Sequence, residues 1–324
     1  MQKILITGGA GFIGSHCTRA LLKRNNQVVC LDNFNDFYNP DIKRHNIKEF
    51  DGNMNYTCVV GDIRDMELMD RLFDEHQFDA VIHLAAMAGV RPSIENPLLY
   101  EDVNVKGFQV ILENMRKYKV KKLLAASSSS VYGNNIKVPF SETDNVDFAI
   151  SPYAATKKSN EVMAHVYHQL YDLDIILLRF FTVYGPGQRP DLAIHKFTKL
   201  IDQGKPIPFF GDGSTRRDYT FIQDIVDGVM ASLDYVNEHE KCYEIINLGE
   251  ATPIDLNEMV SIIEQTLGKK AVLNQLPMQA GDVNVTFADI EKARRLLNYN
   301  PHTSFSDGIQ AFVEWYRKVN NNAE

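Results

Sequence analysis

The 324-residue sequence contains only four cysteines, Cys17, Cys30, Cys58 and Cys242, and they are scattered along the chain. They form no Cys-x-x-Cys pair and no cluster with histidine, so the sequence predicts neither a disulfide framework nor a zinc-type site. The nine histidines also lack the spacing of metal ligands. We therefore expect no bound metal, and we expect four buried thiols in a reducing compartment.

Long apolar runs and basic clusters are missing as well. No run approaches the length of a membrane span, and the first apolar stretch begins almost at Met1, which leaves no room for a signal peptide. The formal net charge is -8, and basic residues occur only as short pairs such as Lys121-Lys122. Because nucleic-acid binding needs clustered positive charge, we expect a cytoplasmic protein that binds neither nucleic acid nor membrane. A small anionic ligand held by a few arginines is compatible with this charge.

What the sequence does contain is an alternation of short apolar and longer amphipathic stretches from Lys3 to about Leu178. This alternation is typical of a parallel sheet with helices on both faces. The fold class predicted is α/β, a Rossmann-type doubly wound parallel sheet with a smaller α/β substrate-binding lobe. Strands are expected near 3–7, 27–32, 56–60, 80–84, 122–127 and 174–179, and long helices at 97–118 and 153–171.

A glycine-rich turn follows the first predicted strand. Gly8, Gly11 and Gly14 have the spacing of a dinucleotide-binding fingerprint, and a helical sequence begins at Ser15. In such a fingerprint the glycines permit a tight turn, a close approach to the pyrophosphate, and close packing of helix on strand. The phosphates then lie at the positive end of the helix.

Acidic and apolar residues at the following strand ends extend this site. Asp32 ends the second strand about 20 residues beyond the glycines, where a carboxylate binds the adenosine ribose and repels a 2′-phosphate, which favours NAD over NADP. Two later strands end near Asp62 and Leu84, on the same sheet edge. We predict as cofactor-binding residues Gly8, Gly11, Phe12, Ile13, Gly14, Asp32, Asn33, Asp62, Ile63, Leu84, Ala85 and Ala86, together with Tyr153 and Lys157. His16, His83 and His195 are expected to be loop or packing residues.

The chain changes character after Arg179. Residues 180–218 are rich in Gly, Pro, Arg and Phe, which predicts loops that meet a ligand rather than a regular layer. A strand and helix pattern returns over 219–248, and two or three helices are expected within 252–320. We assign 1–179 plus 219–248 to the dinucleotide-binding domain, 180–218 plus 249–320 to the substrate lobe, and 321–324 to a frayed tail.

A tyrosine and a lysine stand one turn apart at the start of a predicted helix. Ser151 is the expected N-cap, Pro152 the first helical residue, and Lys157 follows Tyr153 by four positions. An ammonium group and an oxidised nicotinamide both favour the phenolate of a tyrosine, whose pKa is ordinarily about 10. The run Ser127 to Ser130 ends another strand, and its hydroxyls can bridge a reacting alcohol to Tyr153. The combination predicts redox chemistry on an alcohol.

These motifs resemble those of the extended short-chain dehydrogenases/reductases, in the group of nucleotide-sugar epimerases and dehydratases. The resemblance covers nearly the whole chain. Its motifs are 7–14, 62–63, 83–86, 127–133, 153–157, 179–186 and 217–219. Within the group the chain is most similar to UDP-glucuronate 4-epimerases, on residues 32–38, 88–91, 127–133 and 189–191.

The resemblance implies a mechanism and a set of roles. Tyr153, Lys157 and Ser128 are the implied catalytic residues, with Ser128 beside Tyr153 and Lys157 on the nicotinamide ribose. The implied substrate contacts are Ser129, Ser130, Thr182, Arg189, Arg217 and Gln279. Thr182 and Arg189 would hold the sugar carboxylate, and Arg217 the UDP phosphates. NAD would oxidise C4 of UDP-glucuronate, and hydride return to the opposite face would give UDP-galacturonate, with NAD regenerated.

One position departs from the group. Many members carry an arginine two residues before the Gly-Asp of a late phosphate loop, whereas this chain has Gln279 before Gly281-Asp282. The departure puts the phosphate contact of that loop in doubt.

The helices at 97–118 and 153–171 leave two interpretations open, since their apolar faces suit either packing on the sheet or a homodimer contact.

Three other functions stay open at this stage. A UDP-glucose or UDP-N-acetylglucosamine 4-epimerase differs from a glucuronate epimerase by only a few contacts around C6 and C2. A 4,6-dehydratase or decarboxylase typically has acidic residues where this chain has Ser129 and Ser130, and elimination then lacks its proton carrier. A non-enzymatic NAD-binding scaffold requires loss of a catalytic residue, and Tyr153, Lys157 and Ser128 are all present.

Overall fold

The computed structural model describes residues 1–277 and 285–321. Its larger part is a seven-stranded sheet with the order β10-β6-β5-β4-β1-β2-β3, in which every neighbouring pair is parallel. The strands are β1 (Lys3–Thr7), β2 (Gln27–Asp32), β3 (Tyr56–Val60), β4 (Ala80–His83), β5 (Lys122–Ser128), β6 (Asp174–Phe180) and β10 (Tyr243–Leu248). Six of them lie at the predicted positions to within one residue, and the Rossmann-type order confirms the predicted fold class.

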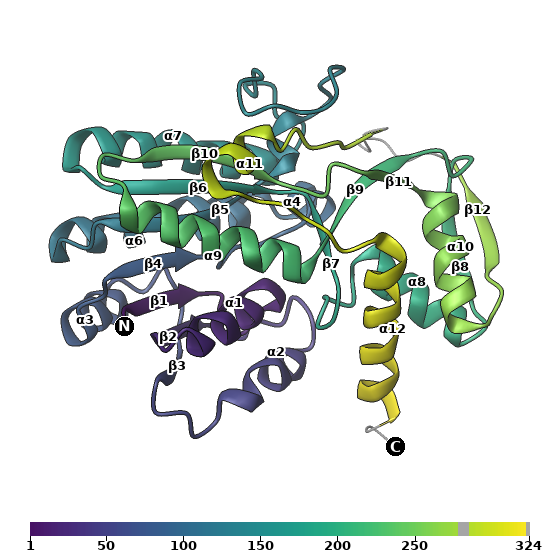
Figure 1. The fold of residues 1–324 in the computed structure, drawn as a ribbon, viewed down its shortest axis with the longest axis horizontal. Coiled ribbons are helices and arrows are strands. Elements are labelled where there is room, and N and C mark those ends of the chain that lie inside the picture. The colour runs from purple at the N-terminus through teal and green to yellow at the C-terminus, as the bar shows by residue number, and fades with distance from the viewer. Residues whose placement is uncertain (278–284, 322–324) are drawn as a thin grey trace.

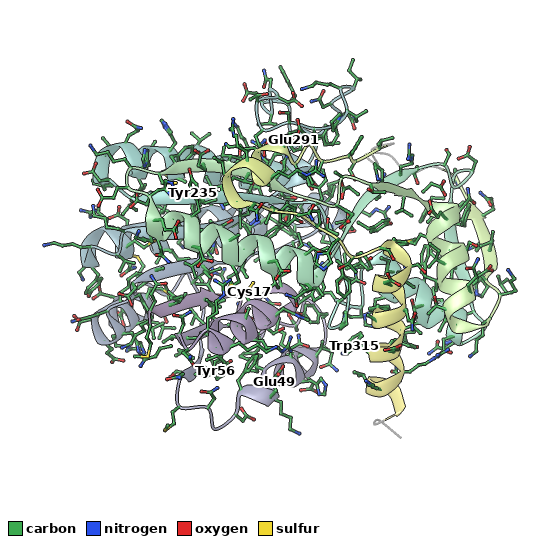
Figure 2. The ribbon with its side chains drawn as sticks, viewed as in Figure 1. Cys17, Glu49, Tyr56, Tyr235, Glu291 and Trp315 are labelled. Atoms are coloured by element: carbon green, nitrogen blue, oxygen red, sulfur yellow. The ribbon has the colours of Figure 1, made fainter. Side chains whose placement is uncertain are left out.

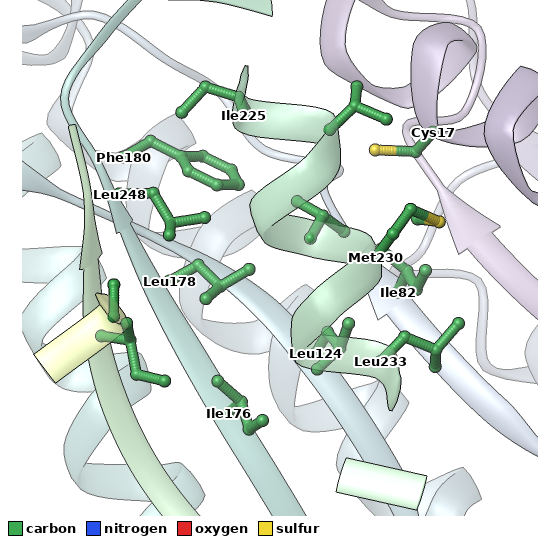
Figure 3. Packing of buried hydrophobic residues seen from close by; sticks show 14 of the residues in the cluster. Cys17, Ile82, Leu124, Ile176, Leu178, Phe180, Ile225, Met230, Leu233 and Leu248 are labelled. Atoms are coloured by element: carbon green, nitrogen blue, oxygen red, sulfur yellow. The ribbon is translucent and has the colours of Figure 1, made fainter. Parts of the chain in front are cut away.

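Helices cover both faces of this sheet (Figure 1). Alternate residues of β1 point to opposite faces, so Ile4 and Ile6 enter one hydrophobic core and Leu5 enters another. The first core lies under α1 (Phe12–Lys23), α9 (Ile222–Glu238) and α11 (Glu291–Leu297). The second core lies under α3 (Met66–His76), α6 (Gly107–Tyr118) and α7 (Pro152–Tyr171). Figure 3 shows α9 directing Ile225, Met230 and Leu233 onto the strands.

A smaller part follows β6 in the chain and lies to one side of the sheet in Figure 1. It contains a three-stranded sheet of the order β11-β9-β7 and a two-stranded sheet of β12 and β8. Its elements are β7 (Thr182–Tyr184), α8 (Ala193–Asp202), β8 (Pro206–Phe210), β9 (Arg216–Phe221), β11 (Pro253–Asp255), α10 (Leu256–Leu267), β12 (Val272–Leu276) and α12 (Phe305–Asn321). A third core contains residues of β7, α8, β8, β9, β11, α10 and α12. The side chain of Trp315 on α12 (Figure 2) meets the ring of His195 with centroids 5.6 Å apart.

Shorter elements connect the main layers. They are α2 (Pro40–Ile47), α4 (Val90–Glu95), α5 (Pro97–Glu101), a π-helical turn over Asp102–Lys106, and 3-10 turns over Lys48–Phe50 and Ser129–Tyr132. The helix predicted at 97–118 is therefore present, with a π-helical turn between α5 and α6. Within residues 1–277 and 285–321, no helix combines the length and the apolar character that crossing a lipid bilayer requires.

Two expectations from the sequence were wrong. Residues 180–218 do not form loops alone, because they contain α8 and β8, and Ile194, Phe197 and Ile201 give α8 a buried face at helical spacing. The flanking glycines and prolines hid this pattern. Cys58 is also not buried, because it lies on β3, the edge strand of the sheet. The predicted domain boundaries stay a prediction.

Asp218 of β9 links the small sheet to the large one. Its buried carboxylate accepts the backbone N–H groups of Glu250 (2.8 Å) and Ala251 (3.1 Å), which follow β10, and that of Ala288 (3.0 Å). Burial raises the pKa of this carboxyl, and the three backbone bonds act in the opposite direction. Asp218 therefore satisfies backbone donors that would otherwise be buried without a partner.

We expect Asp218→Ala to lower the free energy of unfolding by about 3–5 kcal/mol, because it leaves these buried donors unsatisfied. Urea denaturation followed by circular dichroism measures the change. Asp212→Ala is the matched control, because Asp212 is exposed and its side chain bonds to Ser214 of its own loop. Equal stability of the two variants would contradict the linking role of Asp218.

Candidate functional site

A cavity of about 390 Å³ opens at the carboxyl edge of the seven-stranded sheet. Its size is within the usual range for a ligand pocket. Nineteen predicted site residues line it: Gly8, Gly11, Phe12, Ile13, Gly14, Asp32, Asn33, Asp62, Ile63, Leu84, Ala85, Ala86, Ser128, Ser129, Ser130, Tyr153, Lys157, Thr182 and Arg189. Residues far apart in the sequence thus meet at one place, as expected where parallel strands end.

The glycine turn forms a cradle that larger residues would fill. Gly8 has a positive φ of 70°, and a Cβ atom on it would lie 2.7 Å from the backbone nitrogen of Ala85. A Cβ atom on Gly14 would lie 2.2 Å from the carbonyl oxygen of Gly8. Gly11 is the N-cap of α1 and offers no side chain to the first N–H groups of the helix. This turn therefore has the backbone donors and the space that a pyrophosphate requires.

Asp32 is held in the cavity by a partner that the sequence analysis missed. Its carboxylate accepts a hydrogen bond from Lys43 Nζ at 3.0 Å and another from the backbone N–H of Phe34 at 2.9 Å. Both side chains of the ion pair are less than a tenth exposed. Lys43 and Ile47 are four residues apart on α2, which places them on the same face of the helix, and both are buried. The apolar Ile47 therefore indicated in the sequence which face of this helix is buried, and Lys43 lies on that face.

Polar contacts also fix the loops beside the glycines. The Asp62 carboxylate accepts hydrogen bonds from Arg64 and from Asn33 (3.0 Å), which lower its pKa to about 2. Thr7 Oγ1 accepts the backbone N–H of Ala85 at 3.3 Å and bonds to His83 Nδ1 at 2.7 Å. His83 is buried, and burial lowers its pKa to about 3. It is a packing residue, as expected.

The start of α7 places Tyr153 and Lys157 on the cavity wall. Ser151 Oγ accepts the backbone N–H of Ala154 at 3.1 Å and Pro152 is at the first turn, which confirms the predicted helix start. The Tyr153 ring meets Tyr100 edge-on with centroids 6.2 Å apart, and Tyr100 donates to the Ala88 carbonyl at 2.9 Å. The orientation of Tyr153 is therefore supported by a ring that is itself anchored.

Two groups counteract the effect of burial on Tyr153. Burial raises the pKa of its hydroxyl, whereas a hydrogen bond to Ser128 and the positive charge of Arg189 act to lower it. The Ser128 contact was expected from the resemblance, whereas Arg189 was expected only at the substrate. The cation that favours the phenolate in the structure is thus Arg189, and the same effect expected from Lys157 stays a prediction.

Lys157 is fully inside the protein and donates from Nζ to the Ala126 carbonyl at 2.8 Å. Burial lowers its pKa to about 8, and the negative charge of Glu161, one turn further along α7, acts to raise it. The Glu161 carboxylate accepts from Ser127 Oγ (2.6 Å) and from Arg179 Nε and Nη2 (2.8 Å each). Glu161 thereby joins α7 to both β5 and β6.

Arg189 lies where the small part of the molecule meets the cavity. Its guanidinium stacks over the ring of Phe37 at 5.2 Å and forms two hydrogen bonds with Asp191. Thr182, on β7, lines the same cavity. The structure therefore brings Arg189, Thr182 and Tyr153 to a common space.

Two predicted site residues remain, Arg217 and Gln279. Arg217 lies on β9 and is not among its described lining residues, and it donates to the carbonyl of Arg216 at 3.0 Å. Gln279, with Gly281-Asp282, lies outside the described residues. The phosphate-binding roles of Arg217 and Gln279 stay predictions.

A family model described as GDP-mannose 4,6 dehydratase matches residues 5–312. The chain belongs to this family. The match extends over almost the whole chain and agrees with the extended short-chain dehydrogenase/reductase motifs of the sequence.

Similar members of the family include epimerases. A UDP-glucuronate 4-epimerase from Thermodesulfobacterium geofontis is 44% identical over 98% of this chain and 97% of its own length. The crystal structure of UDP-glucuronic acid 4-epimerase from Bacillus cereus, in complex with UDP-glucuronic acid and NAD, has a TM-score of 0.92 at 38% identity, over 98% of this chain and 99% of that one. A UDP-glucose 4-epimerase from Thermotoga maritima, with UDP-glucose, has a TM-score of 0.88 at 32% identity, over 98% and 99% of the two chains.

We expect Glu161→Gln to lower the pKa of Lys157 below its value of about 8, because the carboxylate that favours the ammonium form is removed. NMR titration of the protein with isotope-labelled lysine measures this pKa. Glu314→Gln, at an exposed position of α12, should leave it unchanged. A Lys157 pKa that stays the same or rises in Glu161→Gln would refute the coupling.

Proposed function

We propose that this protein is a UDP-glucuronate 4-epimerase that interconverts UDP-glucuronate and UDP-galacturonate through a transient 4-keto sugar, with tightly bound NAD. The observation that carries the proposal is the position of Arg189, a cation suited to a carboxylate, in the same cavity as Tyr153 and the glycine cradle. The similarity to UDP-glucuronate 4-epimerases over nearly the full length supports it.

The residues present fit NAD. The cradle at Gly8 and Gly14 excludes a Cβ atom, which leaves space for the pyrophosphate at the N-terminus of α1. Asp32, oriented by Lys43, suits the two hydroxyls of the adenosine ribose. When bound, NAD accepts hydride from the sugar and returns it within one turnover. Lys157, which lines the same cavity, would hold the nicotinamide ribose.

Tyr153 would act as the base and later as the acid at the C4 hydroxyl. Its phenolate form is supported by the Ser128 hydrogen bond and by the charge of Arg189. Ser128 can pass the proton between the sugar hydroxyl and Tyr153. General acid–base groups of this kind contribute about 10² to 10⁴ in rate.

A glucuronate substrate adds a hazard, because its 4-keto form is a β-keto acid that tends to lose carbon dioxide. Arg189 and Thr182 would hold the carboxylate in an orientation that discourages this loss. A guanidinium suits the task because it binds both oxygens in a fixed plane. Ser129 and Ser130, in the 3-10 turn that follows β5, line the cavity and would contact the sugar. Arg217 and Gln279 would contact the UDP phosphates.

Two alternatives are less well supported by the residues of the cavity. A neutral UDP-hexose epimerase leaves the cation of Arg189 without a matching group on the substrate. A 4,6-dehydratase needs an acid–base group near the serine run, where the cavity wall carries Ser129 and Ser130. The family description as dehydratase does not by itself favour elimination, since epimerases belong to the same group.

The protein would act in the cytoplasm as a homodimer. Three exposed apolar residues, Val162, Val166 and Leu170, recur at every fourth position along α7, and Leu98 of α5 is 81% exposed. Such a stripe fits a helix-to-helix contact between two copies. Phe108 and Ile111 of the predicted helix 97–118 pack on the sheet instead, whereas Leu99 is exposed.

We expect the purified protein to carry NAD and to convert UDP-glucuronate with none added, whereas Tyr153→Phe and Lys157→Met lose several decades of activity and stay folded. Chromatography of the sugars after incubation with UDP-glucuronate, UDP-glucose or UDP-N-acetylglucosamine measures the conversion. Tyr235→Phe, on α9 and outside the cavity, is the control. Near-normal turnover by Tyr153→Phe, or conversion of the neutral sugars alone, would refute the proposal.

We expect Arg189→Ala to weaken binding of UDP-glucuronate about tenfold or more, because a charge-assisted contact of about 1.5–3 kcal/mol is lost. Binding of neutral UDP-glucose should change much less, and some product should appear as the decarboxylated pentose. Isothermal titration of both nucleotide sugars tests this. An equal loss of affinity for the two ligands would instead mean that Arg189 stabilises its own loop or binds the phosphates.

We expect Val166→Asp to convert the dimer to a monomer, because it places a charge in the centre of the α7 stripe. Size-exclusion chromatography with light scattering gives the mass in solution. Met54→Asp is the matched control, since Met54 is also an exposed apolar residue but lies before β3. A wild-type monomer, or a dimer that survives Val166→Asp, would reject this interface.

A further inference from the structure

Asp191 is conspicuous because it follows Arg189 by two residues and binds it through both carboxylate oxygens. Arg189 Nε donates to Oδ1 at 3.0 Å, and Nη2 donates to Oδ2 at 2.7 Å. A carboxylate of the protein thus already occupies a guanidinium that is proposed to bind a carboxylate of the substrate. A substrate carboxylate can therefore bind Arg189 only beside Asp191 or by displacing it.

The guanidinium has two edges that can each hold a carboxylate. One edge presents Nε and Nη2, and the other presents Nη1 and the second hydrogen of Nη2. Asp191 takes the first edge. The second edge is then the one on which a substrate carboxylate can form two parallel hydrogen bonds.

The two side chains lie at different depths. The Asp191 side chain is 41% exposed and the Arg189 side chain is 18% exposed. Arg189 lines the cavity, whereas Asp191 is not among its described lining residues. Asp191 therefore holds the guanidinium from the solvent side, which leaves the other edge for the interior.

Other contacts limit the freedom of this pair. The guanidinium carbon of Arg189 lies over the ring of Phe37, 5.2 Å from its centroid, and Pro190 restricts the backbone between the two charged residues. The backbone N–H of Leu192 donates to the Arg189 carbonyl at 3.3 Å, and α8 begins at Ala193. The position of the guanidinium over Phe37 and one of its edges are thus fixed before any ligand binds.

We propose that Asp191 is a positioning residue for substrate specificity: by binding the Nε/Nη2 edge of Arg189, it turns the Nη1/Nη2 edge toward the carboxylate of a UDP-uronate. The inference rests on the proposed function. In this arrangement the two acids do not compete, because they use different edges of one cation. A long, flexible arginine is thereby ordered in advance, which lowers the entropy cost of binding.

The opposite role is also physically possible and gives the opposite result. If Asp191 were a competitor that the substrate displaces, removing its charge would free Arg189 and strengthen UDP-glucuronate binding. The sign of the change in affinity therefore decides between positioning and competition.

The experiment compares Asp191→Asn, Asp191→Ala and Asp191→Glu with the wild type, each loaded with NAD. Isothermal titration gives dissociation constants for UDP-glucuronate and for UDP-glucose, which lacks the carboxylate. We expect the Asn and Ala variants to bind UDP-glucuronate about two- to fivefold more weakly, the upper range for losing a partly exposed ion pair, with UDP-glucose changed less than about twofold. Asp191→Glu should restore part of the preference, because it keeps the charge.

Tighter or unchanged binding of UDP-glucuronate by Asp191→Asn would overturn the proposal, and so would an equal loss for both sugars, which indicates a disturbed loop. Thermal unfolding of each variant identifies a loss of structure. Failure of the proposed function is seen separately, as a wild type that does not convert UDP-glucuronate. Failure of the positioning role is seen when the wild type converts it and the Asp191 variants keep the wild-type ratio of the two dissociation constants.

Discussion

The buried ion pair between Glu161 and Arg179 is the interaction on which the proposed catalytic groups depend. Both side chains are only 1% exposed, and such a pair costs much desolvation unless every polar atom finds a partner. Here Ser127 donates to the carboxylate, and the guanidinium donates to Tyr132 Oη at 3.0 Å, which in turn donates to Asn247 at 2.7 Å. The network ties α7 to β5, β6 and β10. Because Tyr153 and Lys157 are on α7 and Ser128 is on β5, their separation is set by these contacts.

Much of the fold and of the cavity could be predicted because the signals are local. The strands are short apolar runs, and the glycine turn has a fixed spacing, so their positions were read directly from the sequence. The start of α7 follows from Ser151 and Pro152, which cap and open a helix through bonds to near neighbours. The meeting of Tyr153 with the serine run was also predictable, because parallel strands end at one edge.

What could not be predicted depends on contacts between distant residues. Lys43 is exceptional because its charge is buried by pairing with Asp32, and hydropathy alone assigns a lysine to the surface. Asp218 satisfies backbone groups 32 to 70 positions away, which no pattern in its own segment indicates. The exposure of Cys58 follows from the edge position of β3, and strand order is a property of the whole sheet. The effect of the Arg189 charge on Tyr153 likewise arises only when β7 and the loop that follows it have been placed.

The strand order has a consequence for how the chain is made. β6 pairs with β5 on one side and with β10 on the other, and β10 follows only after β7, α8, β8, β9 and α9. During synthesis at about 5–20 residues per second, the outer edge of β6 stays open for several seconds while these elements emerge from the ribosome. The open edge of a strand that is buried along its whole length in the folded protein is a template for pairing with another chain. The nascent protein therefore has a defined interval in which a chaperone that shields strand edges would raise its yield, and that interval closes when Tyr243–Leu248 leaves the exit tunnel.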